Sequence, residues 1–262
     1  MANSYKERLS QLHNKTSENW WPYSFGYPVA RRFVAITGDW KWVTPNAITA
    51  IGSLCLLIGA LLLMVRDNRA DIAAIIILQI HVVLDCADGT LARYRNESTA
   101  LGAFLDKAGD QSGFLVLGGA AGYRAFYEGG IGLGEPWIVV AGGVGAGCYV
   151  AVCYLYWVAS YFELEARTSV EERTALPGKE EHESTFPPFG TRLKEYLLGQ
   201  WRLVHFNAPD FPMWIPVLII WGRPDIAVLA VLITQGATLL RKLVERSMAM
   251  AKLDRAKRSA SE

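Results

Sequence analysis

Long apolar blocks, separated by short polar segments, make up most of this chain. Six blocks come near the roughly 20 residues that cross a bilayer as a helix, although the fifth is short and contains two prolines. They occupy residues 45–65, 71–93, 102–124, 136–162, 209–223 and 225–245. The pattern predicts an all-α polytopic membrane protein with six transmembrane helices.

The polar segments predict the organisation around these helices. Residues 1–43 begin polar and then mix aromatic with basic side chains, which predicts a cytoplasmic segment with an N-terminal interfacial helix. Residues 44–246 form one six-helix membrane domain with a single long cytoplasmic connection at about 163–208, which is charged and broken by prolines. Residues 247–262 form a basic C-terminal tail.

Composition and charge support this interpretation. The chain is 52% hydrophobic and only 19% charged, which is unusual for a soluble domain. If the N-terminus is inside, 21 lysines and arginines lie in inside segments, and only Arg66, Arg69, Arg124 and Arg223 lie outside. This asymmetry places both termini in the cytoplasm, together with the connection between the second and third helices. We expect an integral protein of a prokaryotic cytoplasmic membrane, surrounded by membrane lipids and with no nucleic-acid partner.

Four aspartates lie in the second and third apolar blocks, where ionisable side chains are costly and therefore indicate function. Asp85 and Asp88 are three residues apart, and Asp106 and Asp110 are four apart, so each pair shares one helix face. The short connection makes the two helices antiparallel and can place the pairs opposite each other. Carboxylates this close repel, and hard divalent cations, which take oxygen ligands, are the usual remedy. The spacing therefore predicts a metal site.

Small and cationic residues accompany the aspartates. Gly89 and Gly102 remove side chains from the aspartate-bearing faces, so a bulky ligand can approach the backbone there. Arg93 follows Gly89 by four residues, where a guanidinium could bind phosphate. Asn46 lies at the start of the first helix, and helix N-termini are natural anion sites. Together these residues predict a pocket for a diphosphate at the cytoplasmic side of the bundle.

The motif Asp85-x-x-Asp88-Gly89-x-x-Ala92-Arg93, then eight residues, then Gly102-x-x-x-Asp106-x-x-x-Asp110, resembles the signature of the CDP-alcohol phosphotransferase family. The motif covers only residues 85–110. Six helices, a Pro-Asn-x-x-Thr sequence at 45–49 and a cytoplasmic site also fit that family.

The resemblance implies an enzyme that transfers a substituted phosphoryl group from a CDP-linked donor to an alcohol and releases CMP. It implies two metal ions, Mg²⁺ or Mn²⁺, one bound by Asp85, Asp88 and Asp106 and the other by Asp85, Asp106 and Asp110. Asp110 matches the family's general base. Members are commonly homodimers. The positions that match the CDP-binding residues are Gly89, Ala92, Arg93, Gly102 and Asn46.

The sequence offers candidates for binding the acceptor alcohol, but each has an alternative role. Lys107 lies between two aspartates and could pair with a carboxylate or contact a phosphate on the acceptor. Arg202 and Asn207 precede the fifth helix at the cytoplasmic edge and are candidates either for acceptor binding or for anchoring at the membrane surface.

Several functions remain open at this stage. CDP-diacylglycerol as the donor of a phosphatidyl group is favoured, and transfer of a head group from CDP-choline or CDP-ethanolamine to diacylglycerol is the alternative. A membrane transporter whose aspartates bind a cation is a rival of a different class, but it predicts polar groups that continue across the membrane. A prenyl-diphosphate enzyme would use tighter runs of aspartate. Neither rival explains Gly89, Ala92, Arg93 and Gly102.

Overall fold

The computed structural model describes residues 5–12, 19–167 and 207–259, with residues 190, 194, 196–198 and 200 between them. This described part is helical and contains no strand. The elements are α1 (Tyr5–Gln11), η1 (Pro22–Gly26), α2 (Tyr27–Thr37), α3 (Pro45–Leu62), α4 (Asn68–Arg95), α5 (Ala100–Glu128), α6 (Pro136–Arg167), η4 (Ala208–Asp210), α8 (Phe211–Ile220) and α9 (Pro224–Ser259). The η1 segment is a π-helical turn and η4 is a 3₁₀ turn.

Four of these helices, α3, α4, α6 and α9, are long and apolar enough to cross a membrane. The predicted all-α fold is therefore confirmed for the described residues, with four candidate membrane-spanning helices. The third predicted span corresponds to α5, whose 29 residues include the charged Asp106, Lys107 and Asp110 in its N-terminal part and Arg124 near its C-terminus. The fifth corresponds to α8, which has ten residues. Six crossings, and the side of the membrane on which each end lies, stay predictions.

Short polar motifs determine where the central helices begin and end. Thr44 caps the start of α3, Asp67 caps α4 and Thr99 caps α5, each by accepting a hydrogen bond from a backbone N–H of the first turn. Pro45 occupies the first position of α3, where its missing N–H costs nothing. Asn96 ends α4 in the left-handed conformation, with φ of 55°. The chain therefore turns sharply between α4 and α5.

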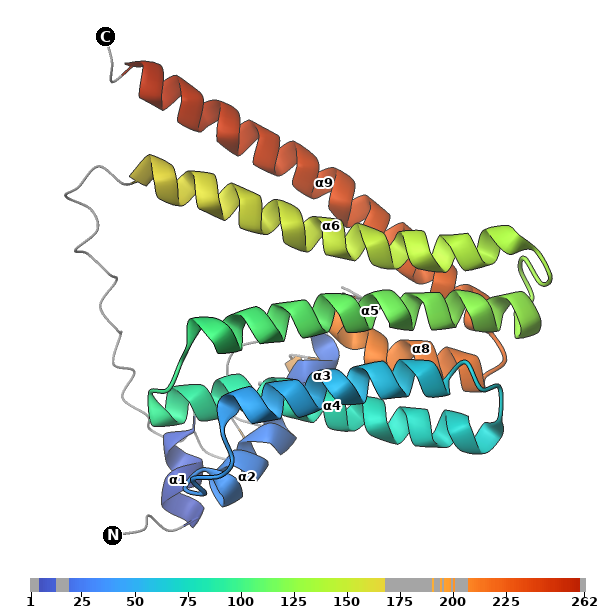
Figure 1. The fold of residues 1–262 in the computed structure, drawn as a ribbon, viewed down its shortest axis with the longest axis horizontal. Helices are drawn as coiled ribbons and strands as arrows, with labels where there is room; N and C mark the ends of the chain where they lie inside the picture. The colour runs from blue at the N-terminus through green and yellow to red at the C-terminus, as the bar shows by residue number, and fades with distance from the viewer. Residues whose placement is uncertain are drawn as a thin grey trace.

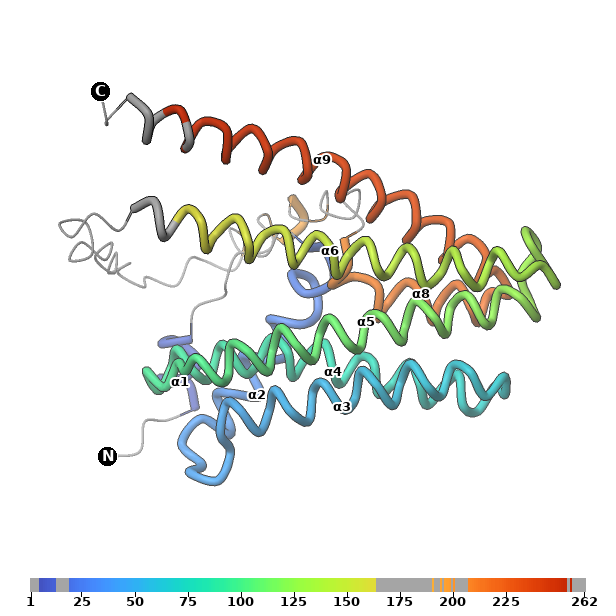
Figure 2. The backbone as a smooth tube through the Cα atoms, turned by 45° about the horizontal axis from the view of Figure 1, so that its top comes forward, coloured from blue at the N-terminus to red at the C-terminus, as the bar shows by residue number. Residues whose placement is uncertain are grey.

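Helix α3 is the common neighbour of α4 and α5, and it contacts both far more extensively than they contact each other. Figures 1 and 2 show these three helices running side by side. Helix α8 packs on α4. Helix α6 packs on α5 and on α9. In both views the C-terminal portions of α6 and α9 diverge from α3, α4 and α5.

Glycines on α5 allow α3 to approach it closely. A Cβ at Gly109 would lie 2.0 Å from Ser53 Oγ, and a Cβ at Gly113 would lie 2.3 Å from Leu56 Cδ2. Both distances are shorter than any real contact, so only glycine fits at the present spacing. Gly109 directly precedes Asp110, and the α3–α5 distance therefore also sets the position of the carboxylates.

Buried side chains form two cores. The larger core includes Leu56, Leu78, Leu117 and Ile215, and it joins α3, α4, α5 and α8. A smaller core joins α2 to the C-terminal half of α4, with Val34 packed among α4 side chains that include Cys86 and Leu91. The smaller core therefore holds the N-terminal helices against the part of α4 that carries Asp85 and Asp88.

The end of the bundle opposite the aspartates is held by buried charges. Arg124 of α5 forms a bidentate ion pair with Asp71 of α4, at 2.6 and 3.0 Å, and donates to the Leu63 carbonyl at 3.0 Å. Both charged side chains are about 5% exposed. Such a pair stays favourable only while both partners are present. The α3–α4–α5 unit is thus fixed at one end by ionic contacts and carries its carboxylates at the other.

Candidate functional site

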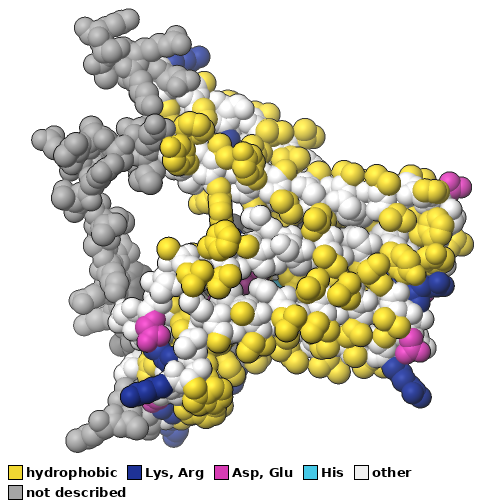
Figure 3. All heavy atoms as spheres, in the orientation of Figure 1, with side chains coloured by type: hydrophobic (Ala, Val, Ile, Leu, Met, Phe, Trp, Pro, Cys, Tyr) yellow, Lys and Arg dark blue, Asp and Glu magenta, His cyan; other side chains and the backbone are white. Residues whose placement is uncertain are grey.

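Three carboxylates converge at one end of the bundle. Asp85 of α4, and Asp106 and Asp110 of α5, each offer an oxygen, and these oxygens lie within 4.8 Å of one another. Their convergence follows from the i,i+4 spacing on α5 and from the packing of α3 against both helices. In the space-filling view, acidic side chains are visible at the bottom of a recess between rows of hydrophobic side chains (Figure 3).

The space between these carboxylates suits a small hard cation. A gap of about 10 Å³ lies among them, close to the size that holds one water molecule. Oxygens on opposite sides of a bound Mg²⁺ are about 4.2 Å apart, so three oxygens within 4.8 Å need only small shifts to reach it. The donor set is entirely carboxylate, which such ions prefer. The gap is lined by Thr49, Gly52, Ser53, His81, Asp85, Asp88, Asp106 and Asp110.

Asp88, the fourth predicted metal ligand, has protein hydrogen-bond partners for both of its carboxylate oxygens. Its Oδ2 accepts a 2.6 Å hydrogen bond from Thr49 Oγ1, and its Oδ1 accepts one from the backbone N–H of Gly89. It is buried and borders the same gap as the other three, but it is not in their cluster. The structure therefore gathers Asp85, Asp106 and Asp110 and holds Asp88 beside them.

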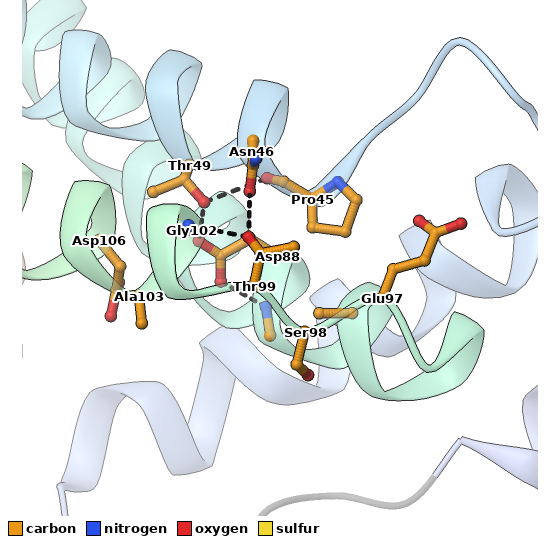
Figure 4. Close-up of a pocket in the computed structure, with 12 residues that line it drawn as sticks. Pro45, Asn46, Thr49, Asp88, Glu97, Ser98, Thr99, Gly102, Ala103 and Asp106 are labelled. Atoms are coloured by element: carbon orange, nitrogen blue, oxygen red, sulfur yellow. Dashed lines mark hydrogen bonds between the residues drawn. The ribbon is translucent and has the colours of Figure 1, made fainter.

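A larger pocket of about 170 Å³ opens next to Asp88 and Asp106. Figure 4 shows Asp106 at one end of it and Glu97 at the other, with Asn46 and Thr49 on the α3 side. The first turns of α3 and α5 both contribute to its wall, and the free N–H groups there favour an anion. The lining residues are Pro45, Asn46, Thr49, Asp88, Gly89, Ala92, Glu97, Ser98, Thr99, Gly102, Ala103 and Asp106.

Four of the five residues expected to bind CDP, namely Asn46, Gly89, Ala92 and Gly102, line this pocket. A Cβ at Gly102 would lie 2.7 Å from Asn46 Oδ1, and a Cβ at Gly89 would lie 3.2 Å from Arg93 Nη1. The Arg93 guanidinium therefore lies over Gly89. It makes a 3.4 Å contact with Thr90 Oγ1, and it forms no ion pair with a carboxylate of the described residues.

The three expected acceptor residues are in different situations. Lys107 Nζ lies 2.7 Å from Asp106 Oδ2 and 4.0 Å from Asp110 Oδ2, so it pairs with carboxylates, which is one of its two predicted roles. Asn207 caps η4 and donates a 3.1 Å hydrogen bond to Asn19, which links the N-terminal segment to the start of α8. Arg202 lies outside the described residues.

The structure adds residues that the sequence pattern did not single out for the site. Glu97 and Ser98, in the connection between α4 and α5, line the larger pocket. Tyr27 of α2 approaches the aspartate-bearing part of α4, because Gly26 lets η1 pack on Cys86 with no room for a Cβ. Burial, and then the nearby Cys86 and Asp85, raise the pKa of the Tyr27 phenol to about 12. Tyr27 therefore stays a neutral hydrogen-bond donor. The local signal for this approach was the glycine before Tyr27.

His81, by contrast, joins two helices through a contact with a backbone carbonyl. Its Nδ1 lies 3.0 Å from the Gly52 carbonyl, and the ring is buried between α3 and α4 at the edge of the gap.

The arrangement as a whole suits a diphosphate bound together with divalent cations. An acidic cluster with room for an ion adjoins a pocket bordered by two helix N-termini. The Arg93 guanidinium, which forms no ion pair among the described residues, lies over Gly89 of that pocket. A ligand there would have to carry negative charge, and the charge would be shared between cations, Arg93 and backbone N–H groups.

Comparisons with known proteins agree with this chemistry. The family model for CDP-alcohol phosphatidyltransferase matches residues 42–175, about half of the chain, and this range includes all four aspartates and the larger pocket. A phosphatidylinositol phosphate synthase of Mycobacterium marinum is 35% identical over 100 residues, which cover 38% of this chain and 40% of that protein. The chain therefore belongs to the CDP-alcohol phosphatidyltransferase family, whose members transfer substituted phosphate groups.

Proposed function

We propose that the chain transfers a phosphatidyl group from CDP-diacylglycerol to an alcohol and releases CMP, as a step of phospholipid synthesis. The observation that carries the proposal is the convergence of Asp85, Asp106 and Asp110 beside a pocket lined by the family's motif residues. Family membership also weighs against a cation transporter. The Mycobacterium marinum relative is named for the synthesis of a phosphatidyl lipid, which supports the phosphatidyl direction of transfer.

In the proposed reaction, the acceptor hydroxyl oxygen forms a bond with the phosphorus that carries the diacylglycerol. The bond between that phosphorus and the oxygen that bridges it to CMP breaks, and CMP leaves with the bridging oxygen. The hydroxyl proton goes to Asp110, whose side chain is mostly buried and offers an oxygen within 4.8 Å of those of Asp85 and Asp106.

The remaining residues bind and orient the donor. Arg93 and Asn46 contact its phosphates, while Gly89, Ala92 and Gly102 leave room for the cytidine diphosphate. Asp85, Asp88, Asp106 and Asp110 would hold two divalent cations, Mg²⁺ or Mn²⁺. The bound metal supplies charge neutralisation for the phosphate oxygens and for the departing CMP.

Position in the membrane is part of the proposal. The concentration of lysine and arginine near the site end supports a cytoplasmic site with both termini inside, in the cytoplasmic membrane of a prokaryote. Helix α2, whose exposed residues include Arg32 and Ile36, suits the interfacial position proposed for the N-terminal segment. Large apolar side chains are exposed along α6 and α9, and lipid together with a second copy of the chain would cover them.

The test is a transfer assay with the purified full chain in lipid vesicles. Labelled CDP-diacylglycerol is supplied with Mg²⁺ or Mn²⁺ and, in separate reactions, glycerol phosphate, inositol, inositol phosphate or serine. We expect CMP release and a labelled phosphatidyl product with one of these acceptors. If CMP forms only from CDP-choline or CDP-ethanolamine with diacylglycerol, the head-group direction is correct instead. Cation flux without CMP release from any pair would contradict both.

A further inference from the structure

Arg95, the last residue of α4, binds three backbone carbonyls of one turn. Its Nε donates to Gly38 O at 2.7 Å, its Nη1 to Val43 O at 2.7 Å and its Nη2 to Trp40 O at 2.8 Å. These carbonyls belong to residues 38–43, which connect α2 to α3 and are called the α2–α3 turn below. The Arg95 side chain is only 13% exposed.

The geometry explains why an arginine is needed. Gly38 is the C-cap of α2, where helix carbonyls have no intrahelical partner and carry partial negative charge. A guanidinium has five N–H donors in one plane and can bind several carbonyls at once. Tyr94 holds the same turn, because its hydroxyl donates to Asp39 at 3.2 Å and its ring lies 3.0 Å from where a Cβ of Gly38 would be.

Arg95 also lies behind two walls of the larger pocket. Val43 directly precedes Thr44, the N-cap of α3, and Pro45 and Asn46 follow as pocket residues. On its other side, Arg95 Nη1 pairs with Glu97 Oε2 at 3.7 Å, and Glu97 lines the pocket from the α4–α5 connection. Arg95 thus connects the segment that leads into α3 with the α4–α5 connection, and α3 and that connection each form a wall of the larger pocket. Arg95 itself does not line that pocket.

We propose that Arg95 is a positioning residue for the CDP-linked donor, which fixes the α2–α3 turn and so holds the start of α3 at the correct distance from the α4–α5 connection. This inference rests on the proposed function. Without the three hydrogen bonds, the turn would sample many conformations, and only a fraction of molecules would present a complete pocket. The apparent affinity for the donor is then the intrinsic affinity multiplied by the fraction of molecules with a complete pocket. Once the donor is bound, the same complex reacts, so the chemical step is unaffected.

The experiment compares Arg95→Met, Arg95→Lys and Arg32→Met in the vesicle assay. Arg32 is a matched control, because it is an exposed arginine of α2 whose one hydrogen bond within the described part of the chain goes to the Pro28 carbonyl of its own helix. We expect Arg95→Met to raise the KM for CDP-diacylglycerol about tenfold, the size of effect that follows from loss of about one net hydrogen bond, with kcat within about twofold of wild type. Arg95→Lys keeps the charge and three donors, so its KM should be intermediate. Arg32→Met should match wild type.

A donor KM for Arg95→Met equal to that of wild type would overturn the inference, and so would a lower kcat at an unchanged KM. Circular dichroism and size-exclusion chromatography show whether Arg95→Met folds. If it does not, Arg95→Lys decides: a raised donor KM supports the inference, and a wild-type KM contradicts it.

If the wild-type chain transfers no phosphatidyl group, the proposed function fails, and CMP binding then tests Arg95 separately. Calorimetric titration with CMP should give a weaker affinity for Arg95→Met than for wild type and Arg32→Met. Equal affinities in the three proteins, or a wild-type chain that binds no CMP, would reject the role of Arg95.

Discussion

Thr49 Oγ1 donates a 2.6 Å hydrogen bond to Asp88 Oδ2 and so joins the first turns of α3 to the aspartate-bearing part of α4. Both residues are buried. Because the Gly89 N–H binds the other oxygen, each oxygen of Asp88 has a protein partner. This pairing turns the Asp88 carboxylate toward α3 and the larger pocket, while the carboxylates of Asp85, Asp106 and Asp110 face one another.

Replacing Thr49 by valine tests this pairing. Thr49→Val keeps the shape but leaves a buried carboxylate oxygen without its donor, which should lower the free energy of unfolding by about 1–3 kcal/mol. The rate of CMP release should fall about tenfold, because Asp88 loses its fixed orientation beside the gap. Thr49→Ser retains the hydroxyl and serves as the control. Initial rates and thermal unfolding of the three proteins give the answer, and a fully active Thr49→Val would show that the contact is dispensable.

Asp110→Asn should abolish turnover and leave binding of the donor measurable. The amide nearly preserves size but cannot accept the hydroxyl proton, and general-base catalysis typically contributes about 10²–10⁴-fold. Rates are measured by CMP release, and donor binding by calorimetry with CDP-diacylglycerol in vesicles. Gln111→Ala, at the neighbouring position, is expected to keep most of the activity. An active Asp110→Asn protein would exclude Asp110 as the base.

Removal of divalent cations should stop transfer reversibly. Excess EDTA is expected to eliminate CMP release, and added Mg²⁺ or Mn²⁺ should restore it. In Asp106→Asn, one oxygen of the three-carboxylate cluster is replaced by an amide, so the metal concentration for half-maximal rate should rise at least tenfold. Metal titrations of wild type and variant measure this shift. Undiminished turnover in EDTA would rule out a metal-dependent reaction.

Gly109→Ala should disturb the site from outside it. The added Cβ would lie 2.0 Å from Ser53 Oγ and 2.7 Å from Ser53 Cβ, so α3 and α5 must separate. We expect lower thermal stability. The metal concentration for half-maximal rate should rise, because Asp110 moves with α5. Gly119→Ala on the same helix meets nothing within 4 Å and should be neutral or stabilising by up to about 1 kcal/mol. Adding Ser53→Gly to Gly109→Ala should restore much of the loss, and its failure would point to another cause.

Arg124→Met should destabilise the protein without affecting the chemistry. It leaves Asp71 buried and unpaired, at a cost of about 3–5 kcal/mol, while the site lies at the other end of the bundle. The double variant Arg124→Met, Asp71→Leu removes both charges and should recover most of that stability. Denaturant unfolding in detergent measures the free energy, and the rate per folded molecule should stay near wild type. A double variant as unstable as the single one would argue against an ion-pair effect.

The sequence alone determined the features that depend on neighbouring residues. Hydrophobic block length predicted the positions of the long helices. Spacing along one helix predicted that Asp106 and Asp110 share a face. The family motif is contiguous over residues 85–110, so it could be recognised without coordinates.

Only the tertiary structure decided how distant residues meet. It made α3 the common neighbour of α4 and α5, turned Asp88 toward Thr49 and brought Arg95 to the α2–α3 turn. Thr49 and Asp88 are 39 residues apart, and Arg95 and Gly38 are 57 apart, so helical periodicity says nothing about their distance. Those contacts depend on how closely whole helices pack. Here the absence of a Cβ at Gly109 and Gly113 sets that distance, and a glycine shows this role only once the side chain opposite it is known.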